Sequence, residues 1–69
     1  MNEIIFVVEE SDEGGYIAKA LGTGIITEAE TIEELREAVK EAVHCHYEDE
    51  ATRPKMIRLH LVKDEVFAA

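Results

Sequence analysis

A run of five apolar residues near the N-terminus constrains the fold of this chain most strongly. Ile4–Val8 reads IIFVV, with the acidic residues Glu3, Glu9 and Glu10 on either side. Successive side chains of a strand point to opposite faces of its sheet, so this run is apolar on both faces. Its β-branched residues also favour a strand. We therefore expect residues 1–10 to form a strand in the centre of a sheet.

Turn-forming residues divide the next segment into two more strands. Ser11–Gly15 reads SDEGG, and its two glycines can adopt positive φ. Tyr16–Leu21 resumes the strand pattern, Gly22–Gly24 interrupts it, and Ile25–Thr27 is a third short β-branched run. Short connections of this kind join antiparallel neighbours. The sequence therefore predicts a three-stranded antiparallel meander.

A helix is predicted to begin at Thr31. Glu34 stands three residues later and completes a T-x-x-E capping box, in which the hydroxyl and the carboxylate bond to unpaired backbone N–H groups. One stripe at three- and four-residue spacing contains Ile32, Leu35, Val39, Ala42, Val43 and His46. We expect the helix to extend to about Tyr47 or Asp49 and to pack this stripe on one face of the sheet.

A fourth strand, Met56–Val62, follows a connection that contains Pro54, which cannot continue a helix. Ile57, Leu59 and Leu61 alternate with Arg58 and His60, so one side of the strand is polar. The fold class is α+β: a single β-β-β-α-β domain over residues 1–69, with one helix on one sheet face. The other face would present Tyr16, Ala18 and Ala20, or their alternates, as a contact surface.

The small size of the chain predicts self-association. A core built from 69 residues supplies roughly 3–5 kcal/mol. Cys45 is the single cysteine, so no disulfide within one chain can add to this. We expect a homo-oligomer, a dimer or a tetramer. No apolar run approaches the ~20 residues of a membrane span and no signal peptide precedes the first strand, which predicts a cytoplasmic protein without membrane contact.

The net charge of −9 is unevenly distributed. Residues 1–50 contain 14 acidic and 3 basic side chains, a net −11, whereas residues 51–69 contain 2 acidic and 4 basic, a net +2. A negative surface repels phosphate backbones and attracts basic proteins. We therefore expect no direct nucleic-acid binding and favour a basic protein as partner; the alternative is that the acids only keep a small protein soluble.

No constellation of residues indicates catalysis. His44, Cys45 and His46 are consecutive on the helix and diverge by about 100° each, so they cannot meet at one metal ion. We expect a surface His44 and a buried or half-buried Cys45 and His46. Ser11 has no histidine and acid partners, and the carboxylates show no pair suited to acid–base work. The sequence predicts neither an enzyme nor a cofactor or metal.

These features together resemble the HicB-like antitoxin family of type II toxin–antitoxin systems. The matching motifs are the apolar first strand, Gly14–Ala18 (GGYIA), Gly24, Glu30–Leu35 (ETIEEL) and Val39–Ala42 (VKEA), and they cover residues 3 to about 62. The resemblance implies a partial RNase H-like fold without catalytic acids. Many members of that family carry a further C-terminal DNA-binding domain; we expect this chain to be a short form without it, which puts operator binding in doubt.

The partner implied by the resemblance is a small basic HicA-type toxin that cleaves mRNA. Burying the active face of such a toxin under an acidic surface would block RNA access. We expect the toxin-binding residues to be Glu9, Glu10, Asp12 and Glu13 in the hairpin and Glu33, Glu37 and Glu41 on the helix. The alternative is a stand-alone oligomeric binding or scaffolding module with the same fold and no toxin. A third hypothesis, a residual nuclease, requires three or four carboxylates within a few ångströms of one another.

Overall fold

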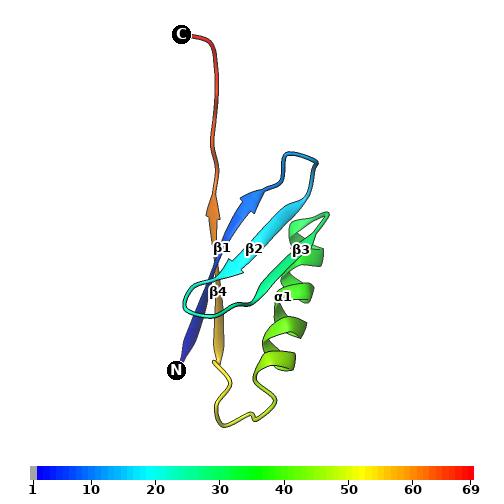
Figure 1. The fold of residues 1–69 in the computed structure, drawn as a ribbon, viewed down its shortest axis with the longest axis vertical. Coiled ribbons are helices and arrows are strands. Elements are labelled where there is room, and N and C mark those ends of the chain that lie inside the picture. Colours follow the sequence, from blue (N-terminus) through cyan, green and yellow to red (C-terminus); the bar gives the residue numbers. More distant parts are fainter. Residues whose placement is uncertain (1) are drawn as a thin grey trace.

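The computed structural model describes residues 2–69 and contains four strands and one helix. In chain order these are β1 (Glu3–Glu10), β2 (Tyr16–Ala20), β3 (Ile26–Ala29), α1 (Ile32–His46) and β4 (Met56–Val62). The predicted α+β class, the order of elements and the three-stranded antiparallel meander are confirmed. The sheet order is β3-β2-β1-β4, which places the apolar first strand in the interior, as its two-sided pattern predicts (Figure 1).

The pairing of β4 makes the sheet mixed. β1 pairs with β2 in antiparallel fashion and with β4 in parallel fashion, so that Ile4 lies beside Ile57 and Phe6 beside Leu59. The parallel direction follows from the helix, which carries the chain back along the sheet between β3 and β4, as crossover connections do. The backbone N–H of Met56 fixes the start of β4 by donating to the Asn2 carbonyl oxygen at 2.9 Å.

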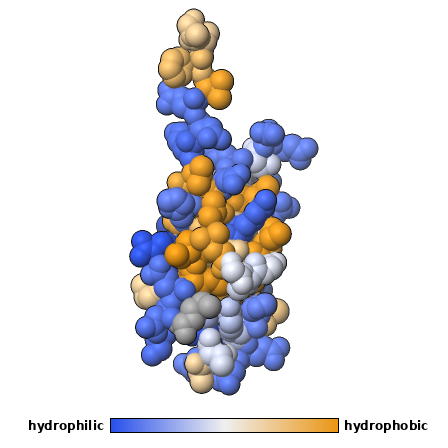
Figure 2. Space-filling model, turned by 60° about the vertical axis from the view of Figure 1, so that its left-hand side comes forward, coloured by the Kyte–Doolittle hydropathy of each residue, from blue (hydrophilic) through white to orange (hydrophobic). Residues whose placement is uncertain are grey.

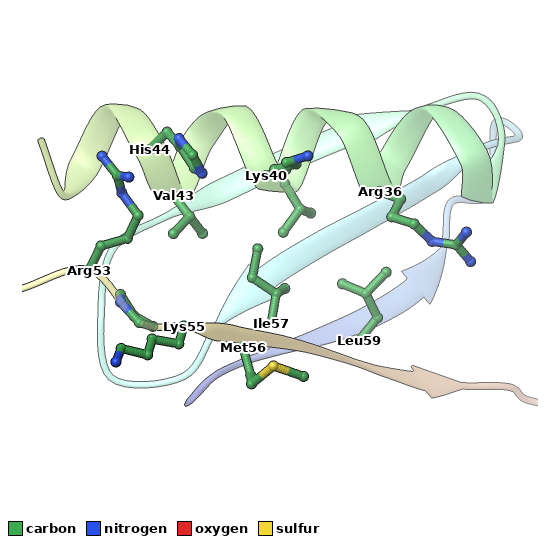
Figure 3. A pocket seen from close by; sticks show the side chains of 11 residues that line it. Arg36, Lys40, Val43, His44, Arg53, Lys55, Met56, Ile57 and Leu59 are labelled. Atoms are coloured by element: carbon green, nitrogen blue, oxygen red, sulfur yellow. The ribbon is translucent and has the colours of Figure 1, made fainter. Parts of the chain in front are cut away.

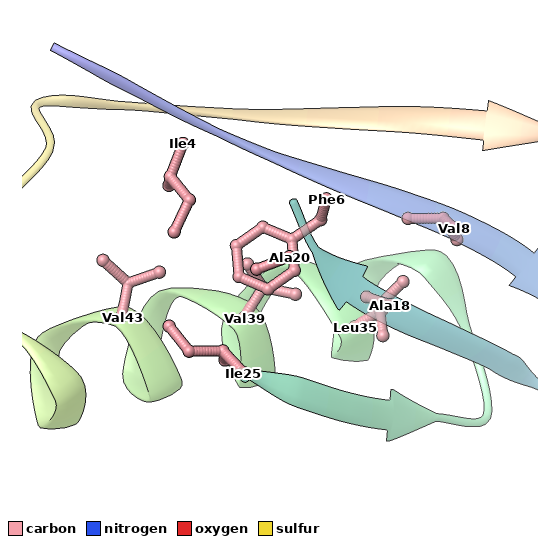
Figure 4. Close-up of a cluster of buried hydrophobic side chains, with 9 residues drawn as sticks. All are labelled: Ile4, Phe6, Val8, Ala18, Ala20, Ile25, Leu35, Val39 and Val43. Carbon is pink, nitrogen blue, oxygen red and sulfur yellow. The ribbon is translucent and has the colours of Figure 1, made fainter. Parts of the chain in front are cut away.

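The hydrophobic core lies between one face of this sheet and the helix (Figure 4). It is built from alternate residues of β1 and β2 together with the buried stripe of α1. Its members are Ile4, Phe6, Val8, Ala18, Ala20, Ile25, Leu35, Val39 and Val43. Ala18 and Ala20 therefore belong to the core, and their alternates Ile17 and Lys19 occupy the open face of the sheet.

The start of α1 confirms the Thr31 half of the predicted capping box; within residues 2–69 the Glu34 carboxylate accepts no backbone hydrogen bond there. Thr31 is the N-cap, and its Oγ1 accepts a hydrogen bond from the backbone N–H of Glu34 at 3.1 Å. Glu33 and Glu34 stand in the first turn, where negative charge interacts favourably with the helix dipole. This cap fixes where the chain leaves β3 and turns into the helix.

Replacing Thr31 by alanine is expected to lower the free energy of unfolding by about 1 kcal/mol, because the N–H of Glu34 loses its hydrogen-bond acceptor. Thr31→Ser keeps the hydroxyl and serves as the matched control. Denaturant unfolding followed by circular dichroism measures both variants. Equal unfolding free energies for the alanine and serine variants would contradict the role of the cap.

The end of α1 differs from the prediction for two side chains. The stripe predicts a buried or half-buried Cys45 and His46, but both are exposed; His44 is exposed as predicted. The prediction is wrong because Val43 is the last buried residue of the helix. His46 lies on the same face of the helix as the apolar stripe, but it is one turn beyond the core. Its ring packs edge-on against the ring of Tyr47, with 4.8 Å between the ring centroids.

The face of the sheet opposite the helix is uncovered, and it carries an apolar patch (Figure 2). The register places Val7, Lys19 and Ile26 across three neighbouring strands of this face. Ile26 is 65% exposed although it is a large apolar residue. Beyond β4, residues 63–69 continue away from the body of the domain (Figure 1). Within residues 2–69, the single helix is neither long nor apolar enough for a membrane span.

Candidate protein-binding site

Carboxylates gather where the β1–β2 turn meets the junction of β3 and α1. A hollow of about 500 Å³ at this place is lined by Glu13 from the turn, by Glu28 and Glu30 from the end of β3, and by Glu34 from the helix. No lysine, arginine or histidine lines this hollow within the part of the chain that the structure describes. A concave surface lined by one sign of charge concentrates the electrostatic field. We call this region the acidic end.

The backbone holds the two halves of the acidic end together. The turn is closed by two hydrogen bonds: the N–H of Ser11 donates to the Gly15 carbonyl oxygen, and the N–H of Gly14 donates to the Ser11 carbonyl oxygen, each at 3.0 Å. Gly15 then approaches Ala29 and Glu30 so closely that an added Cβ would lie 2.7 Å from the Ala29 carbonyl oxygen. The absence of a side chain at residue 15 therefore lets the hairpin turn and the start of the helix form one surface.

A second hollow continues the acidic end on the side of β4. It has a volume of about 220 Å³ and is lined by Glu9, Glu10 and Asp12 from the hairpin and by Asp64 from the C-terminal segment, with Lys63 as its one cation. The hairpin acids predicted as partner-binding residues thus occupy two adjoining hollows, with Glu13 in the larger one. All four are exposed.

The three predicted helix residues are spread along α1 instead of joining the hairpin acids as one cluster. Glu33 is exposed in the first turn, at the acidic end. Glu41 lies eight residues further on, about 12 Å along the helix axis. Glu37 and Glu41 line a shallow depression together with Lys40 and His44, so the charge of Lys40 offsets part of theirs. The structure instead adds Glu28, Glu30 and Glu34 to the acidic end.

The acids of this region have no ion-pair partners within the described residues. The one salt bridge of residues 2–69 joins Arg58 of β4 to Glu3 of β1, with Nε 2.6 Å from Oε1. The hydrogen bond from Arg58 lowers the pKa of the Glu3 carboxyl below its ordinary value. This pair lies on the open sheet face at the other end of β1. The charge of the acidic end is therefore directed toward solvent and is available to a partner.

A groove of opposite charge lies between α1 and β4, and sequence reasoning missed it (Figure 3). Its volume is about 360 Å³. Arg36, Lys40, His44, Arg53 and Lys55 line its rim, and the apolar residues that border it are Val39, Val43, Pro54, Met56, Ile57 and Leu59. The signal that could have revealed it is the four-residue spacing of Arg36, Lys40 and His44, which aligns them on one helix face. We call this the basic groove.

Residues with metal-binding or nucleophilic chemistry are dispersed. No group of three or more histidine, cysteine, aspartate or glutamate side chains within residues 2–69 is placed to hold a metal ion. Cys45 is an exposed free thiol. Ser11 acts structurally, because its Oγ accepts a hydrogen bond from the backbone N–H of Glu13 at 3.3 Å. The geometry of the acidic end supports protein binding through charge.

Two known proteins of similar sequence match this chain. The chain is 57% identical over 53 residues to a UPF0150 protein of Archaeoglobus fulgidus, and the aligned residues are 77% of each chain. It is 44% identical over 66 residues to a UPF0150 protein of Thermotoga maritima, which covers 96% of this chain and 91% of the relative. No family model matches the chain. No solved structure matches it either.

Proposed function

The chain belongs to the UPF0150 family, and we propose that this member is a non-catalytic, antitoxin-like protein. It binds and neutralises a small basic HicA-type toxin that cleaves mRNA, and it does so in the cytoplasm. The observation that carries the proposal is the acidic end, where Glu13, Glu28, Glu30 and Glu34 line one hollow that holds no lysine, arginine or histidine of residues 2–69. The resemblance to HicB-like antitoxins supplies the identity of the partner.

Neutralisation in this proposal is steric and is aided by charge. A ribonuclease binds the phosphate backbone of its substrate through basic residues. The acidic end offers carboxylates to those residues, and complementary charges speed the encounter of the two proteins. Once docked, the domain covers the RNA-binding surface of the toxin. No bond is made or broken, and the domain needs no cofactor.

Reversing two charges of the acidic end tests the proposal. Glu10→Lys/Glu13→Lys is expected to weaken binding of the basic toxin about 30-fold, because two attractive contacts become repulsive at roughly 1 kcal/mol each. Titration calorimetry at low salt measures the affinity, and growth of cells that co-express both proteins measures the neutralisation. The wild-type complex should also weaken as salt is added.

The matched control carries the same change of charge at the opposite end of the domain. Glu48→Lys/Glu50→Lys alters two exposed acids of the α1–β4 connection and should leave the affinity within about threefold of wild type. An equal reduction in both variants would mean that net charge, and not the acidic end, determines binding. No complex at low salt together with undiminished toxicity would refute the antitoxin proposal in favour of the stand-alone oligomeric module.

The proposed protein is also a homo-oligomer. The open sheet face presents Val7, Ile17 and Ile26, and exposed apolar surface of this kind is typical of contact surfaces. Light scattering coupled to size exclusion is expected to give the mass of two or four chains at micromolar concentration. A single-chain mass under these conditions would contradict self-association.

A further inference from the structure

The C-terminal segment of this chain carries apolar side chains that its own domain leaves uncovered. Val66 is 94% exposed and Phe67 is 81% exposed, on a segment that extends beyond β4 (Figure 1). Two acids, Asp64 and Glu65, directly precede them. The segment 63–69 thus combines negative charge with an exposed aromatic ring.

The basic groove has the complementary character. Its floor includes Ile57 and Leu59, which point from β4 toward the helix, whereas Met56 points away from it (Figure 3). Arg36 and Lys40 stand on the helix side, and no carboxylate of residues 2–69 lines the groove. Arg53 also borders it, although its Nε and Nη2 donate to the carbonyl oxygens of Tyr47 and Glu48 at the end of α1.

The groove is open because β4 is an edge strand. β4 pairs with β1 on one side, and its other side has no neighbouring strand within residues 2–69. The backbone N–H and C=O groups on that side are available to an added strand, a common mode of peptide recognition. An extended segment placed there would lie beside the floor residues of the groove.

We propose that the segment 63–69 of one copy pairs antiparallel with the β4 edge of a second copy and fills its basic groove. Side chains of a strand alternate between faces, so a continued strand places Phe67 on the same face as Ile57 and Leu59. A two-fold arrangement centred on Val62 or Lys63 brings Phe67 opposite Ile57 or Leu59 of the other copy. Glu65 shares that face and meets the basic rim.

The same alternation argues against the segment folding back on its own chain. A two-residue turn at Lys63–Asp64 would place Phe67 opposite His60, on the open sheet face. A three-residue turn would bring Phe67 to the groove side but opposite Leu61, which does not line the groove. Pairing with a second copy puts Phe67 on the groove side of the sheet and also opposite a residue that lines the groove.

Disulfide cross-linking between copies that carry single cysteines at different positions tests this pairing of two copies. All chains carry Cys45→Ser, because Cys45 is an exposed thiol. A Phe67→Cys chain is mixed either with an Ile57→Cys chain or with a Leu59→Cys chain, and one of the two mixtures is expected to form a disulfide-linked mixed dimer under mild oxidation, depending on which residue the two-fold arrangement brings opposite residue 67. Val66→Cys in place of Phe67→Cys is the matched control, and it should not link because residue 66 faces away from the groove.

Three outcomes would contradict the proposed pairing of the C-terminal segment with a second copy. These are the absence of the mixed dimer from both mixtures, equal linking through residue 66, and a chain carrying both cysteines (Ile57→Cys/Phe67→Cys or Leu59→Cys/Phe67→Cys) that links within itself. A second measurement does not depend on the engineered thiols: Phe67→Ser should raise the dissociation constant of self-association about 30-fold, as expected when an aromatic side chain is removed from an interface. An unchanged constant would also overturn it. Neither assay contains a toxin, so the result is independent of the proposed function.

Discussion

Phe6→Ala is expected to lower the free energy of unfolding by about 3–5 kcal/mol, which is comparable with the whole stability of a domain of this size. Phe6 is fully buried at the centre of β1 and lies between the sheet and the helix (Figure 4). Truncation leaves a cavity at the position where β1, β2 and α1 meet, and the small residues Ala18 and Ala20 beside it cannot fill the space.

The same substitution at an exposed position provides the control. Phe67→Ala removes the same atoms from a side chain that is 81% exposed, so the monomer should unfold with wild-type free energy. Urea unfolding followed by circular dichroism, at a concentration below self-association, measures both variants. The core assignment would be contradicted if Phe6→Ala cost less than about 1 kcal/mol.

Gly15→Ala is expected to cost about 2–3 kcal/mol, for two separate reasons. The residue has a φ of +79°, in the left-handed region that L side chains rarely adopt. An added Cβ would also stand 2.7 Å from the carbonyl oxygen of Ala29, a backbone atom that can move only if β3 or the hairpin turn shifts. The acidic end should therefore loosen as the stability falls.

Gly22→Ala separates the cost of the backbone conformation from the cost of the steric contact. Its φ is +82°, nearly that of Gly15, but a Cβ there would meet no atom within 4 Å. This control should cost about 1 kcal/mol, from the backbone conformation alone. Thermal and urea unfolding of the two variants give the difference. Equal destabilisation would show that the close approach of Gly15 to Ala29 does not hold the turn against the helix.

The fold was predictable to the extent that its signals are local. The Ile4–Val8 run predicted an interior strand, the SDEGG segment predicted a turn, and the T-x-x-E pattern predicted the helix start; all three are confirmed. The exposure of His46 was not predictable from the stripe, since angular position on a helix does not reveal where the sheet beneath it ends. The spacing of apolar residues in the sequence does not show at which helical turn the contact with the sheet ends.

The candidate site was predictable only in part, for a related reason. The hairpin acids are neighbours in sequence, so their clustering at one end follows from the turn itself. Glu28, Glu30 and Glu34 join Glu13 because Gly15 packs against Ala29, a contact between distant segments. Glu37 and Glu41 instead follow the helix toward Lys40 and His44, where the net charge is smaller.

The sequence by itself determined the elements, the interior position of β1 and the excess of negative charge, because each depends on residues close together in the chain. The tertiary structure decided how these elements face one another. The parallel pairing of β4 with β1 turned Ile57 and Leu59 toward the helix and left an outer edge free. It thereby separated an acidic end from a basic groove, a division that the net charge of −9 conceals.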